Sequence, residues 1–238
     1  MIERTKRTEM LLGAPAMERL RAAHVIVFGL GGVGSWCAEA LARSGLGRLT
    51  LVDEDCVSES NLNRQVCALG STLGRPKAEV MAERLRDIAP DAELIPVTAR
   101  YEAASRSRFF PGGYSYVADC IDLVSCKLDL IEAALGGGTP IISALGTGNK
   151  LDASRLEVCD LAETRGCPLA RVMRRELRRR GIEHLQVVYS SEEAAEPSQP
   201  DAPPPGRRSV PGSTVWVPAS AGLLMAQTII LDIAGVEL

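Results

Sequence analysis

Long apolar segments are scarce in this chain of 238 residues. The charged N-terminus, MIERTKRTEM, lacks the apolar core of a secretory signal peptide. The longest apolar candidate, residues 215–234, is interrupted by proline, serine, glutamine and aspartate, whereas a bilayer span needs roughly 18 apolar residues in a row. We therefore expect a cytoplasmic protein without a membrane partner, in which residues 215–234 contribute a buried helix.

Close pairs of cysteines are also missing. The seven cysteines include no C-x-x-C pair, which argues against a zinc site made of four cysteines. An odd number of cysteines without a secretion signal indicates reduced thiols rather than a disulfide framework.

Aromatic residues make up only 4% of the sequence, and the formal net charge is −3. So few aromatics argue against a surface on which single-stranded bases stack. The net charge offers no general attraction to nucleic acids or anionic lipids, so such a partner must bind a local basic patch.

Residues 24–53 have the pattern of a βαβ nucleotide-binding unit. The apolar run His24–Phe28 predicts a buried strand, and residues 33–44 predict an amphipathic helix. Residues 49–52 predict a second strand, which ends at Asp53. An acid at this distance from the first strand is placed to accept hydrogen bonds from ribose hydroxyls.

The turn between that strand and helix contains the sequence Gly29-x-Gly31-x-x-Gly34. The first glycine permits a tight turn, the second lets the backbone approach a phosphate, and the third lets the helix pack closely on the strand. The free N–H groups at the start of the helix favour an anion. The pattern predicts nucleotide binding without identifying the nucleotide, and NAD is the default expectation.

Two cations follow the second strand. Arg64 lies in the polar run SNLNRQ of residues 60–65, at the carboxyl edge of the expected sheet where ligands bind. Lys77 lies at the start of a helix, where the dipole disfavours a cation unless an anion is close. Both positions suit contacts to phosphates, and the alternatives are a solvated polar loop and a plain surface lysine.

Asp119 and Asp122 follow a later strand, at the same edge of the sheet. Mg²⁺ takes one or two carboxylates together with phosphate oxygens and waters, so one of these acids could complete a metal–triphosphate site. Asp122 could instead cap the following helix. A set of arginine, lysine and metal suits adenylation rather than hydride transfer, because charge must be neutralised on the α-phosphate and on pyrophosphate.

The remaining segments alternate between strand and helix, which predicts an α/β, doubly wound, Rossmann-like and mostly parallel sheet. The expected strands are 94–97, 114–119, 140–144, 156–158 and 185–188. The expected helices are an N-terminal one ending at Arg21, then 77–90, 102–110, 124–135 and 168–180. A strand-like TVWV at 214–217 and a helix at 219–233 complete the chain.

The stretch from Ser191 to Ser213 has a different composition, with five prolines within nine residues. It offers few backbone donors and nothing apolar to bury, so we expect a disordered or extended surface excursion. The whole chain, 1–238, is otherwise expected to form a single domain.

Four motifs occur in an order that resembles the ThiF-like adenylating superfamily, which includes ubiquitin-activating enzymes and activators of sulphur-carrier proteins. They are GxGGxGS, SNLNRQ, GRPKAEVMAERL and DCIDxxxxK. Within this superfamily the chain looks most like the tRNA threonylcarbamoyladenosine dehydratases. The resemblance to that family rests on Arg7–Gly13, Gly113–Asp122, Asp160–Arg171 and Gly212–Gly222.

The resemblance implies a role for each matching position. It assigns the ATP phosphates to Gly29, Gly31, Gly32 and Gly34, and the ribose to Asp53. It assigns contacts with the triphosphate to Asn61, Arg64, Gln65 and Lys77.

The resemblance also assigns Mg²⁺ to Asp122, so that Arg64, Lys77 and Asp122 form the catalytic set. Arg7 matches an arginine that members of the family extend across a dimer interface into the partner's ATP site. A homodimer is therefore implied.

The implied substrate is tRNA carrying threonylcarbamoyladenosine. Its carboxylate would attack the α-phosphate of ATP, and the neighbouring carbamoyl group would then expel AMP and close a ring. This second step is intramolecular, so it gains from proximity and needs no enzyme nucleophile.

Three alternatives remain open. The first is an adenylyltransferase for a sulphur-carrier or ubiquitin-like protein, with a sulphur-transfer protein as partner and a cysteine such as Cys167 as nucleophile. A packed, inert Cys167 is the simpler interpretation. The others are an NAD-dependent oxidoreductase, which the cation set disfavours, and a non-catalytic nucleotide-binding module.

One basic cluster could bind RNA. On the helix expected at 168–180, Arg171, Arg174, Arg175 and Arg178 fall on one face by their spacing. They form either a solvated face opposite an apolar stripe or a platform for tRNA phosphates.

Overall fold

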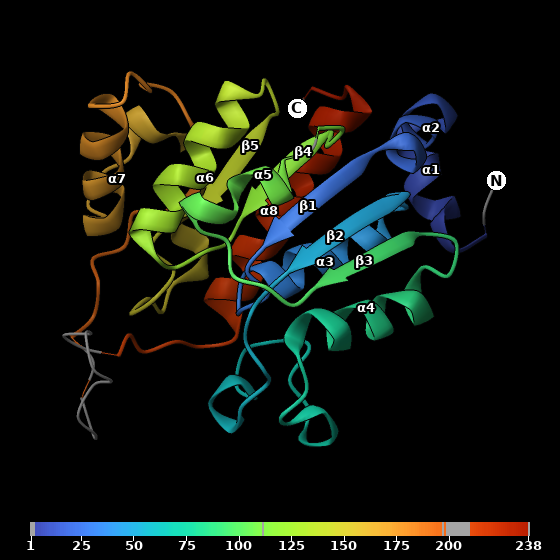
Figure 1. Cartoon of the computed structure of the whole chain (residues 1–238), viewed down its shortest axis with the longest axis horizontal. Coiled ribbons are helices and arrows are strands. Elements are labelled where there is room, and N and C mark those ends of the chain that lie inside the picture. The colour runs from blue at the N-terminus through green and yellow to red at the C-terminus, as the bar shows by residue number, and fades with distance from the viewer. Residues whose placement is uncertain (1–2, 111, 197, 199–209, 238) are drawn as a thin grey trace.

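The computed structural model describes residues 3–110, 112–196, 198 and 210–237 (Figure 1). Within them, seven strands form one sheet in the order β3-β2-β1-β4-β5-β7-β6. The strands are β1 His24–Phe28, β2 Arg48–Val52, β3 Glu93–Val97, β4 Tyr116–Asp119, β5 Ile141–Ala144, β6 Leu156–Asp160 and β7 Gln186–Ser190. All neighbours pair in parallel except β6 and β7, which are antiparallel. The expected doubly wound α/β fold is confirmed.

Eight α-helices flank this sheet in the described part of the chain. They are α1 Lys6–Leu12, α2 Ala14–Ala22, α3 Gly34–Arg43, α4 Lys77–Ile88, α5 Arg106–Phe109, α6 Val124–Gly136, α7 Pro168–Arg178 and α8 Trp216–Ala234. Short 3-10 turns occur at Glu3–Thr5, Glu59–Asn61, Gly70–Thr72, Ala103–Ser105, Ala153–Arg155 and Leu161–Glu163.

Each face of the sheet has its own hydrophobic core, because successive side chains of a strand point to opposite faces. In β1, Val25 and Val27 join the cluster that includes residues of α2, α3, α4 and α8. Ile26 and Phe28 join the cluster that includes residues of α6 and α7. A strand buried on both faces needs a continuous apolar run, which is what the sequence of β1 provides.

Helix α8 packs closely against α3. A Cβ atom added at Gly222 would lie 2.3 Å from the carbonyl oxygen of Val33, so only glycine fits at this crossing. By length and composition α8 could also cross a membrane, with a mean hydropathy of 1.5 over its apolar window. Its residues Ala221, Met225 and Ile229 are nevertheless fully buried within the protein core, as expected for residues 215–234.

The strand expected at 214–217 is wrong. Val215 already has helical backbone angles, and α8 begins at Trp216. Pro218 is compatible with this start, because the first four residues of a helix have no intrahelical acceptor for their N–H groups. The strand-like composition of TVWV therefore does not determine the backbone here: Val217 is fully buried, whereas Val215 is 40% and Trp216 50% exposed.

The proline-rich excursion expected at 191–213 lies mostly outside the described residues. Its described flanks meet at Asn149, the residue with φ +58°. The Ala195 N–H donates to the Asn149 carbonyl at 2.8 Å, and the Asn149 N–H donates to the Gly212 carbonyl at 2.8 Å. Both ends of the excursion are thus tied to the turn after β5.

Candidate nucleotide-binding site

The turn after β1 is built around two glycines that packing requires and one that it does not. Gly29 has φ +85°, and a Cβ atom there would lie 2.7 Å from the Cys120 carbonyl oxygen. A Cβ atom at Gly34 would lie 1.8 Å from the Gly29 carbonyl oxygen. At Gly31 the nearest atom, Gln65 Nε2, would be 3.9 Å away. Gly31 therefore leaves open space beside the start of α3, where an anion is favoured.

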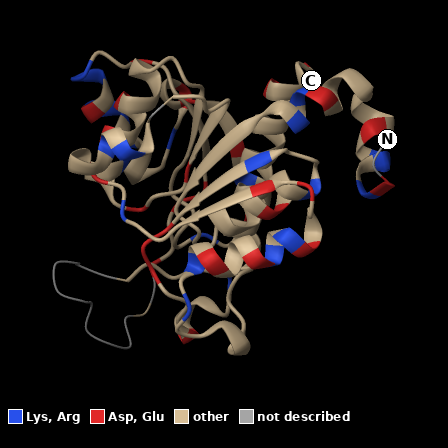
Figure 2. Ribbon diagram, turned by 45° about the vertical axis from the view of Figure 1, so that its right-hand side comes forward, with Lys and Arg blue, Asp and Glu red and all other residues tan. Residues whose placement is uncertain are grey.

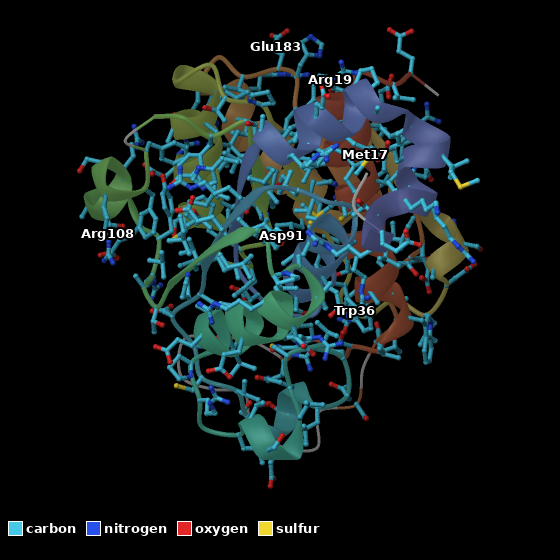
Figure 3. The ribbon with its side chains drawn as sticks, turned by 90° about the vertical axis from the view of Figure 1, so that its right-hand side faces the viewer. Met17, Arg19, Trp36, Asp91, Arg108 and Glu183 are labelled. Atoms are coloured by element: carbon cyan, nitrogen blue, oxygen red, sulfur yellow. The ribbon has the colours of Figure 1, made fainter. Side chains whose placement is uncertain are left out.

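The same turn is bordered by α8 and by the loop that follows β2. A Cβ atom at Gly32 would lie 3.1 Å from Pro218 Cβ and 3.4 Å from Arg64 Cδ. Trp36 is labelled in Figure 3. Its indole N–H donates to the Arg64 carbonyl at 3.1 Å, which fixes this loop to α3. The fold thus places Arg64 beside the glycine turn.

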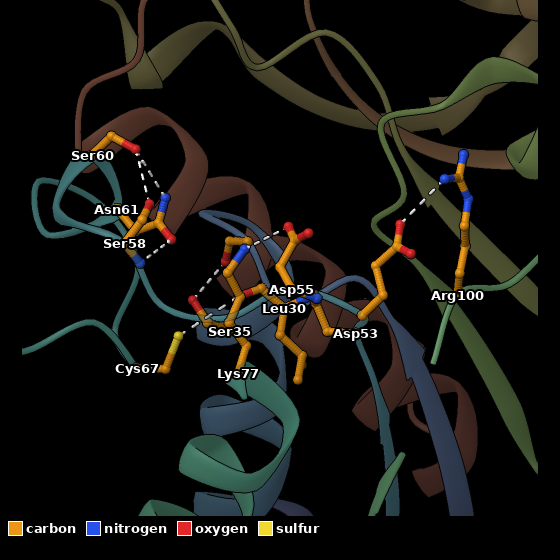
Figure 4. Close-up of polar contacts among 12 residues, drawn as sticks. Leu30, Ser35, Asp53, Asp55, Ser58, Ser60, Asn61, Cys67, Lys77 and Arg100 are labelled. Atoms are coloured by element: carbon orange, nitrogen blue, oxygen red, sulfur yellow. Dashed lines mark hydrogen bonds and ion pairs between the residues drawn. The ribbon is translucent and has the colours of Figure 1, made fainter. Parts of the chain in front are cut away.

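Asp53 stabilises the glycine turn from the end of β2. Its carboxylate accepts hydrogen bonds from the N–H groups of Leu30, at 2.6 Å, and Asp55, at 2.8 Å (Figure 4). Burial raises the pKa of this carboxyl above its ordinary value, although Lys77 and the two N–H groups favour the charged form. The carboxylate is therefore fixed beside the turn, at the position where a ribose is expected.

Lys77 already has an anionic partner within the chain. Its side chain is only 6% exposed, and its Nζ lies 2.9 Å from Asp55 Oδ2 (Figure 4). Asp55 is 64% exposed, so water can solvate its carboxylate. An anion near this helix start is therefore present, as expected. It is the carboxylate of Asp55, however, and not a phosphate.

Arg64 is half-buried and has no carboxylate within ion-pair distance among the described residues. Its Nη1 donates to the Ser60 carbonyl at 2.8 Å and to Asn63 Oδ1 at 2.9 Å. Burial lowers the pKa of this guanidinium from its ordinary value. A desolvated cation without a negative partner is a good candidate for contact with an anionic ligand.

The two amides of the same loop differ. Asn61 is buried and braces the loop, because its Oδ1 accepts the Ser58 N–H at 3.1 Å (Figure 4). Gln65 is also buried, and its Oε1 has no hydrogen-bond donor among the described residues. Of the pair, Gln65 has unused hydrogen-bonding capacity beside Gly31.

The carboxylate of Asp119 is enclosed in the protein and already hydrogen-bonded, so it is not available to a metal ion at the carboxyl edge of the sheet. It is fully buried at the end of β4 and accepts hydrogen bonds from Lys127 Nζ at 2.7 Å and Ser143 Oγ at 2.6 Å. Its Oδ1 also accepts the Ile121 N–H at 3.1 Å. The network holds the turn between β4 and α6 against the glycine turn, because the Cys120 carbonyl borders Gly29.

Asp122 lies at the surface of the turn between β4 and α6. It is exposed, and the N-cap of α6 is Leu123, so the alternative of a helix cap is wrong. Among the described residues no group of three or more His, Cys, Asp or Glu side chains could hold a metal ion. One exposed carboxylate fits the way proteins usually hold Mg²⁺, in which phosphates and waters supply the other ligands.

Lys127 is the lysine of the DCIDxxxxK motif, for which the sequence alone predicts no role. Its side chain is completely buried and also donates to Ser143 Oγ and the Ala144 carbonyl, at 3.0 and 3.1 Å. The helical spacing of Lys127, Leu130, Ile131 and Ala134 puts this lysine on the apolar stripe of α6. A lysine on such a stripe is a signal of a buried ion pair.

The structure does not bring Arg7 to the glycine turn of its own chain. Arg7 is exposed on α1, beside the amino ends of the strands, whereas the glycine turn lies at their carboxyl ends (Figure 1). An ion pair between Arg4 and Asp91, just before β3, fixes the N-terminal segment at that amino end.

All seven cysteines are unpaired, and each lies in the described part of the chain. Cys167 is 4% exposed and forms the N-cap of α7, where its Sγ accepts the Ala170 N–H at 3.5 Å. Burial raises the pKa of Cys37 to about 12 and that of Cys67 to about 11. This geometry favours a packed Cys167 over a nucleophile.

A second charged feature lies on α7 (Figure 2). An open groove of about 430 Å³ is lined by Arg171, Arg174, Arg175, Arg178 and Arg179. Arg174 is not part of a free solvated face, because its Nη1 donates to the Thr164 carbonyl and hydroxyl at 2.7 and 2.8 Å. Arg171 and Arg178 are exposed and form no ion pair with the described residues.

The family model described as "ThiF family" matches residues 5–233. The chain is 38% identical over 242 residues to the tRNA threonylcarbamoyladenosine dehydratase of Bacillus subtilis, covering 98% of this chain and 95% of the relative. It is similar to the crystal structure of the Escherichia coli tRNA N6-threonylcarbamoyladenosine dehydratase in complex with ATP. The TM-score is 0.88 at 34% identity, covering 98% of this chain and 94% of that structure.

A relative with the alternative activity matches a shorter part of the chain. The molybdopterin-synthase adenylyltransferase of Salmonella typhimurium is 40% identical over 126 residues, which cover 53% of this chain and 50% of the relative.

Proposed function

The chain belongs to the ThiF family, and we propose that it is an ATP-dependent tRNA threonylcarbamoyladenosine dehydratase that works through a carboxyl-adenylate. The observation that carries the proposal is the similarity to dehydratases along nearly the whole chain, including the segments outside the nucleotide-binding half. An enzyme that shared only the adenylating step would match a shorter part of the chain, and the adenylyltransferase matches over 126 residues, 53% of it.

We propose that ATP lies over the glycine turn. The start of α3 and Gly31 would receive the phosphates, Gly29 and Gly34 would keep the turn tight, and Asp53 would hold the ribose. Contacts with the triphosphate are proposed for Gly32, Asn61, Arg64, Gln65 and Lys77. Arg64 and Lys77 would neutralise charge that develops on the α-phosphate and on the departing pyrophosphate.

For Lys77 to act in this way, a phosphate must displace or join the carboxylate of Asp55. The exposure of Asp55 supports this exchange, because its solvation replaces the lost ion pair. Mg²⁺ held by Asp122 would add a further positive charge beside the phosphates.

The proposed reaction has two steps. A carboxylate oxygen of threonylcarbamoyladenosine forms a bond to the α-phosphorus, and the bond from that phosphorus to the oxygen bridging to the β-phosphate breaks, which releases pyrophosphate. The carbamoyl group then attacks the activated carbonyl carbon, AMP leaves with the former carboxylate oxygen, and the ring closes. The nucleoside loses one water in total, and the proximity of the two groups replaces an enzyme nucleophile.

A homodimer is part of the proposal. Arg7 and the exposed apolar residues Met10 and Leu11 all lie on α1, with Met10 77% and Leu11 88% exposed. A second chain could cover these apolar side chains and bring Arg7 to a site that it cannot reach in its own chain.

We also propose that α7 contacts tRNA. An enzyme of net charge −3 needs a local basic surface for RNA, and the arginine groove provides one. Arg171 and Arg178 are the residues available for phosphates, whereas Glu176 pairs with Arg175 and Arg179.

Residues 1–238 are proposed to form one adenylating domain that works in the cytoplasm. The alternative, activation of a carrier protein with a sulphur-transfer partner, would need a reactive thiol. Cys56 is the exposed cysteine, and it lies after β2 rather than at the helix start where Cys167 is buried.

The proposed function is tested by incubating the protein with ATP, Mg²⁺ and tRNA that carries threonylcarbamoyladenosine. We expect the digested nucleoside to lose the mass of one water in an ATP-dependent manner. An unchanged nucleoside together with AMP transfer to a carrier protein ending in Gly-Gly would support the alternative instead.

A further inference from the structure

Lys150 differs from the other buried lysines of the protein. The sequence contains four lysines, and Lys77, Lys127 and Lys150 are each no more than 5% exposed. Lys77 and Lys127 are paired with the carboxylates of Asp55 and Asp119. The Nζ atom of Lys150 is buried and has no hydrogen-bond partner among the described residues. A buried ammonium is costly unless a negative or polar group compensates it.

Lys150 lies where hydrogen bonds connect three loops, namely residues 149–151, residues 212–216 and Asn63, and we call this connection the joint. The Gly212 N–H donates to Asn149 Oδ1 at 2.6 Å, and the Trp216 indole N–H donates to the Leu151 carbonyl at 2.7 Å. Lys150 therefore lies in a segment that is tied on both sides to residues 212–216. Asn63 Nδ2 completes the joint by donating to the Ser213 carbonyl at 3.0 Å.

This joint connects Lys150 to the proposed ATP site. Asn63 precedes Arg64, which borders the glycine turn. Two further buried groups in the joined segments lack partners among the described residues, namely the Thr214 hydroxyl and Gln65 Oε1. A cation, a hydroxyl and an acceptor are thus left unsatisfied on connected segments. Among these groups, an unpaired ammonium favours an oxyanion and an unpaired amide oxygen favours a hydrogen-bond donor.

We propose that Lys150 binds an oxyanion of the RNA substrate next to the site of adenylation. This proposal rests on the proposed function. The cations assigned to the triphosphate lie on the β1–β2 side of the glycine turn, whereas Lys150 follows β5. Lys150 would therefore bind the modified tRNA, which is the second anionic reactant besides ATP. The group bound is either the reacting carboxylate or a phosphate beside the modified base.

The test compares the wild type with Lys150→Gln, which keeps a polar side chain but removes the charge. Arg108→Gln is the matched control, because it removes one positive charge from an exposed position on α5 (Figure 3). Binding is measured with tRNA that carries threonylcarbamoyladenosine and with the same tRNA unmodified, while ATP affinity is measured without RNA.

We expect Lys150→Gln to weaken binding of modified tRNA roughly tenfold or more, as for loss of a hydrogen bond to a charged group. ATP affinity and the Arg108→Gln variant should stay at wild-type values, and the Tm of Lys150→Gln should not fall, since an unpaired buried charge has been removed. A loss confined to modified tRNA identifies the carboxylate, and an equal loss with both tRNAs identifies a phosphate. Unchanged tRNA binding, or a lower Tm with ATP affinity lost in parallel, overturns the proposal.

A probe without RNA separates this proposal from the proposed function. Inorganic phosphate should raise the Tm of the wild type more than that of Lys150→Gln. If the protein does not dehydrate modified tRNA but this difference is found, the proposed function fails and an anion site at Lys150 stands. If the nucleoside is dehydrated but the two proteins respond equally to phosphate and bind tRNA equally, Lys150 is not an anion site.

Discussion

Among single residues, the glycines of the turn after β1 have two different roles. Gly29 and Gly34 are required by the fold, whereas Gly31 leaves space for a ligand. The Gly29 carbonyl leaves no room for a side chain at Gly34. At Gly31, by contrast, no atom lies closer than 3.9 Å to an added Cβ. The roles expected from the spacing of the glycines match this geometry, because tight turns and close helix–strand contacts follow from local backbone rules.

Comparing Gly31→Ala with Gly34→Ala tests that distinction. We expect Gly31→Ala to change the free energy of unfolding by less than about 1 kcal/mol while lowering ATP affinity roughly tenfold or more. Gly34→Ala should destabilise the protein by at least about 3 kcal/mol, because backbone atoms cannot move aside cheaply. Denaturant unfolding and ATP titration measure the two quantities. Full ATP affinity in Gly31→Ala would show that no phosphate approaches this residue.

The polar partners of single residues were less predictable. That Asp55 neutralises Lys77 depends on the loop after β2 meeting the start of α4 in space, which no local spacing reveals. The same holds for Lys150, which lies in an irregular loop without periodicity. Lys127 was more accessible to sequence analysis, because its position on an apolar helix stripe is itself a signal.

At the scale of elements, α3 and α4 are joined by a buried acid. Glu39 on α3 is only 8% exposed and binds Arg43 at 2.8 Å and Arg84 of α4 at 2.6 Å. Burial raises the pKa of Glu39, but hydrogen bonds and charge from Arg84 and Arg43 outweigh it and leave the pKa below its ordinary value. The carboxylate therefore stabilises the folded state only while it is ionised.

The lowered pKa of Glu39 predicts how the free energy of unfolding changes as the pH falls. We expect Glu39→Gln to cost about 1–2 kcal/mol near neutral pH. The difference from the wild type should persist above the unfolded-state pKa of about 4.3 and vanish as the pH falls through the lower folded-state value. Unfolding free energies between about pH 3 and 7 measure it. Glu83→Gln, in an exposed pair with Arg75, is the control, and a constant difference at all pH values would contradict the assignment.

Helix α7 supports a second prediction at this scale. Reversing Arg171 and Arg178 to glutamate should weaken tRNA binding roughly tenfold or more and reduce the salt dependence of binding by about two phosphate contacts. ATP binding should be unaffected. The control reverses Arg86 and Arg108, which are exposed on α4 and α5. Equal tRNA affinities of the two double variants would remove α7 from the RNA-binding surface.

Elements were predicted from the sequence largely where hydrophobic periodicity is strong. The strand His24–Phe28 is confirmed at its expected limits, and α4 and α6 begin where expected. The start of α8 does not follow from the sequence, because the short run TVWV has β-branched and aromatic residues typical of a strand although α8 begins at Trp216. Tertiary packing against α3, rather than intrinsic propensity, determines the conformation there.

At the scale of the whole molecule, the position of Arg7 carries the proposal of a dimer. A residue at the amino edge of the sheet serves the nucleotide site only if a second chain presents it, and a single sequence contains no direct signal of such symmetry.

Complementation between two inactive variants tests this arrangement. Arg7→Ala and Lys77→Ala should each be inactive alone, because each lacks one cation at every site. Mixed, exchanged dimers should recover about a quarter of wild-type activity, since half of the dimers are mixed and one of their two sites is intact. Activity that does not rise on mixing, although subunit exchange is verified, would contradict a shared site.

In the proposed mechanism the substrate carboxylate attacks the α-phosphorus of an ATP held over the glycine turn. The most direct measurement uses tRNA whose threonyl carboxylate is labelled with ¹⁸O, followed by mass analysis of AMP and phosphate after one turnover. We expect one heavy oxygen in AMP, because the oxygen that bonds to the α-phosphorus leaves with it. Heavy oxygen in inorganic phosphate, with none in AMP, would show attack on the γ-phosphate and contradict the adenylate mechanism.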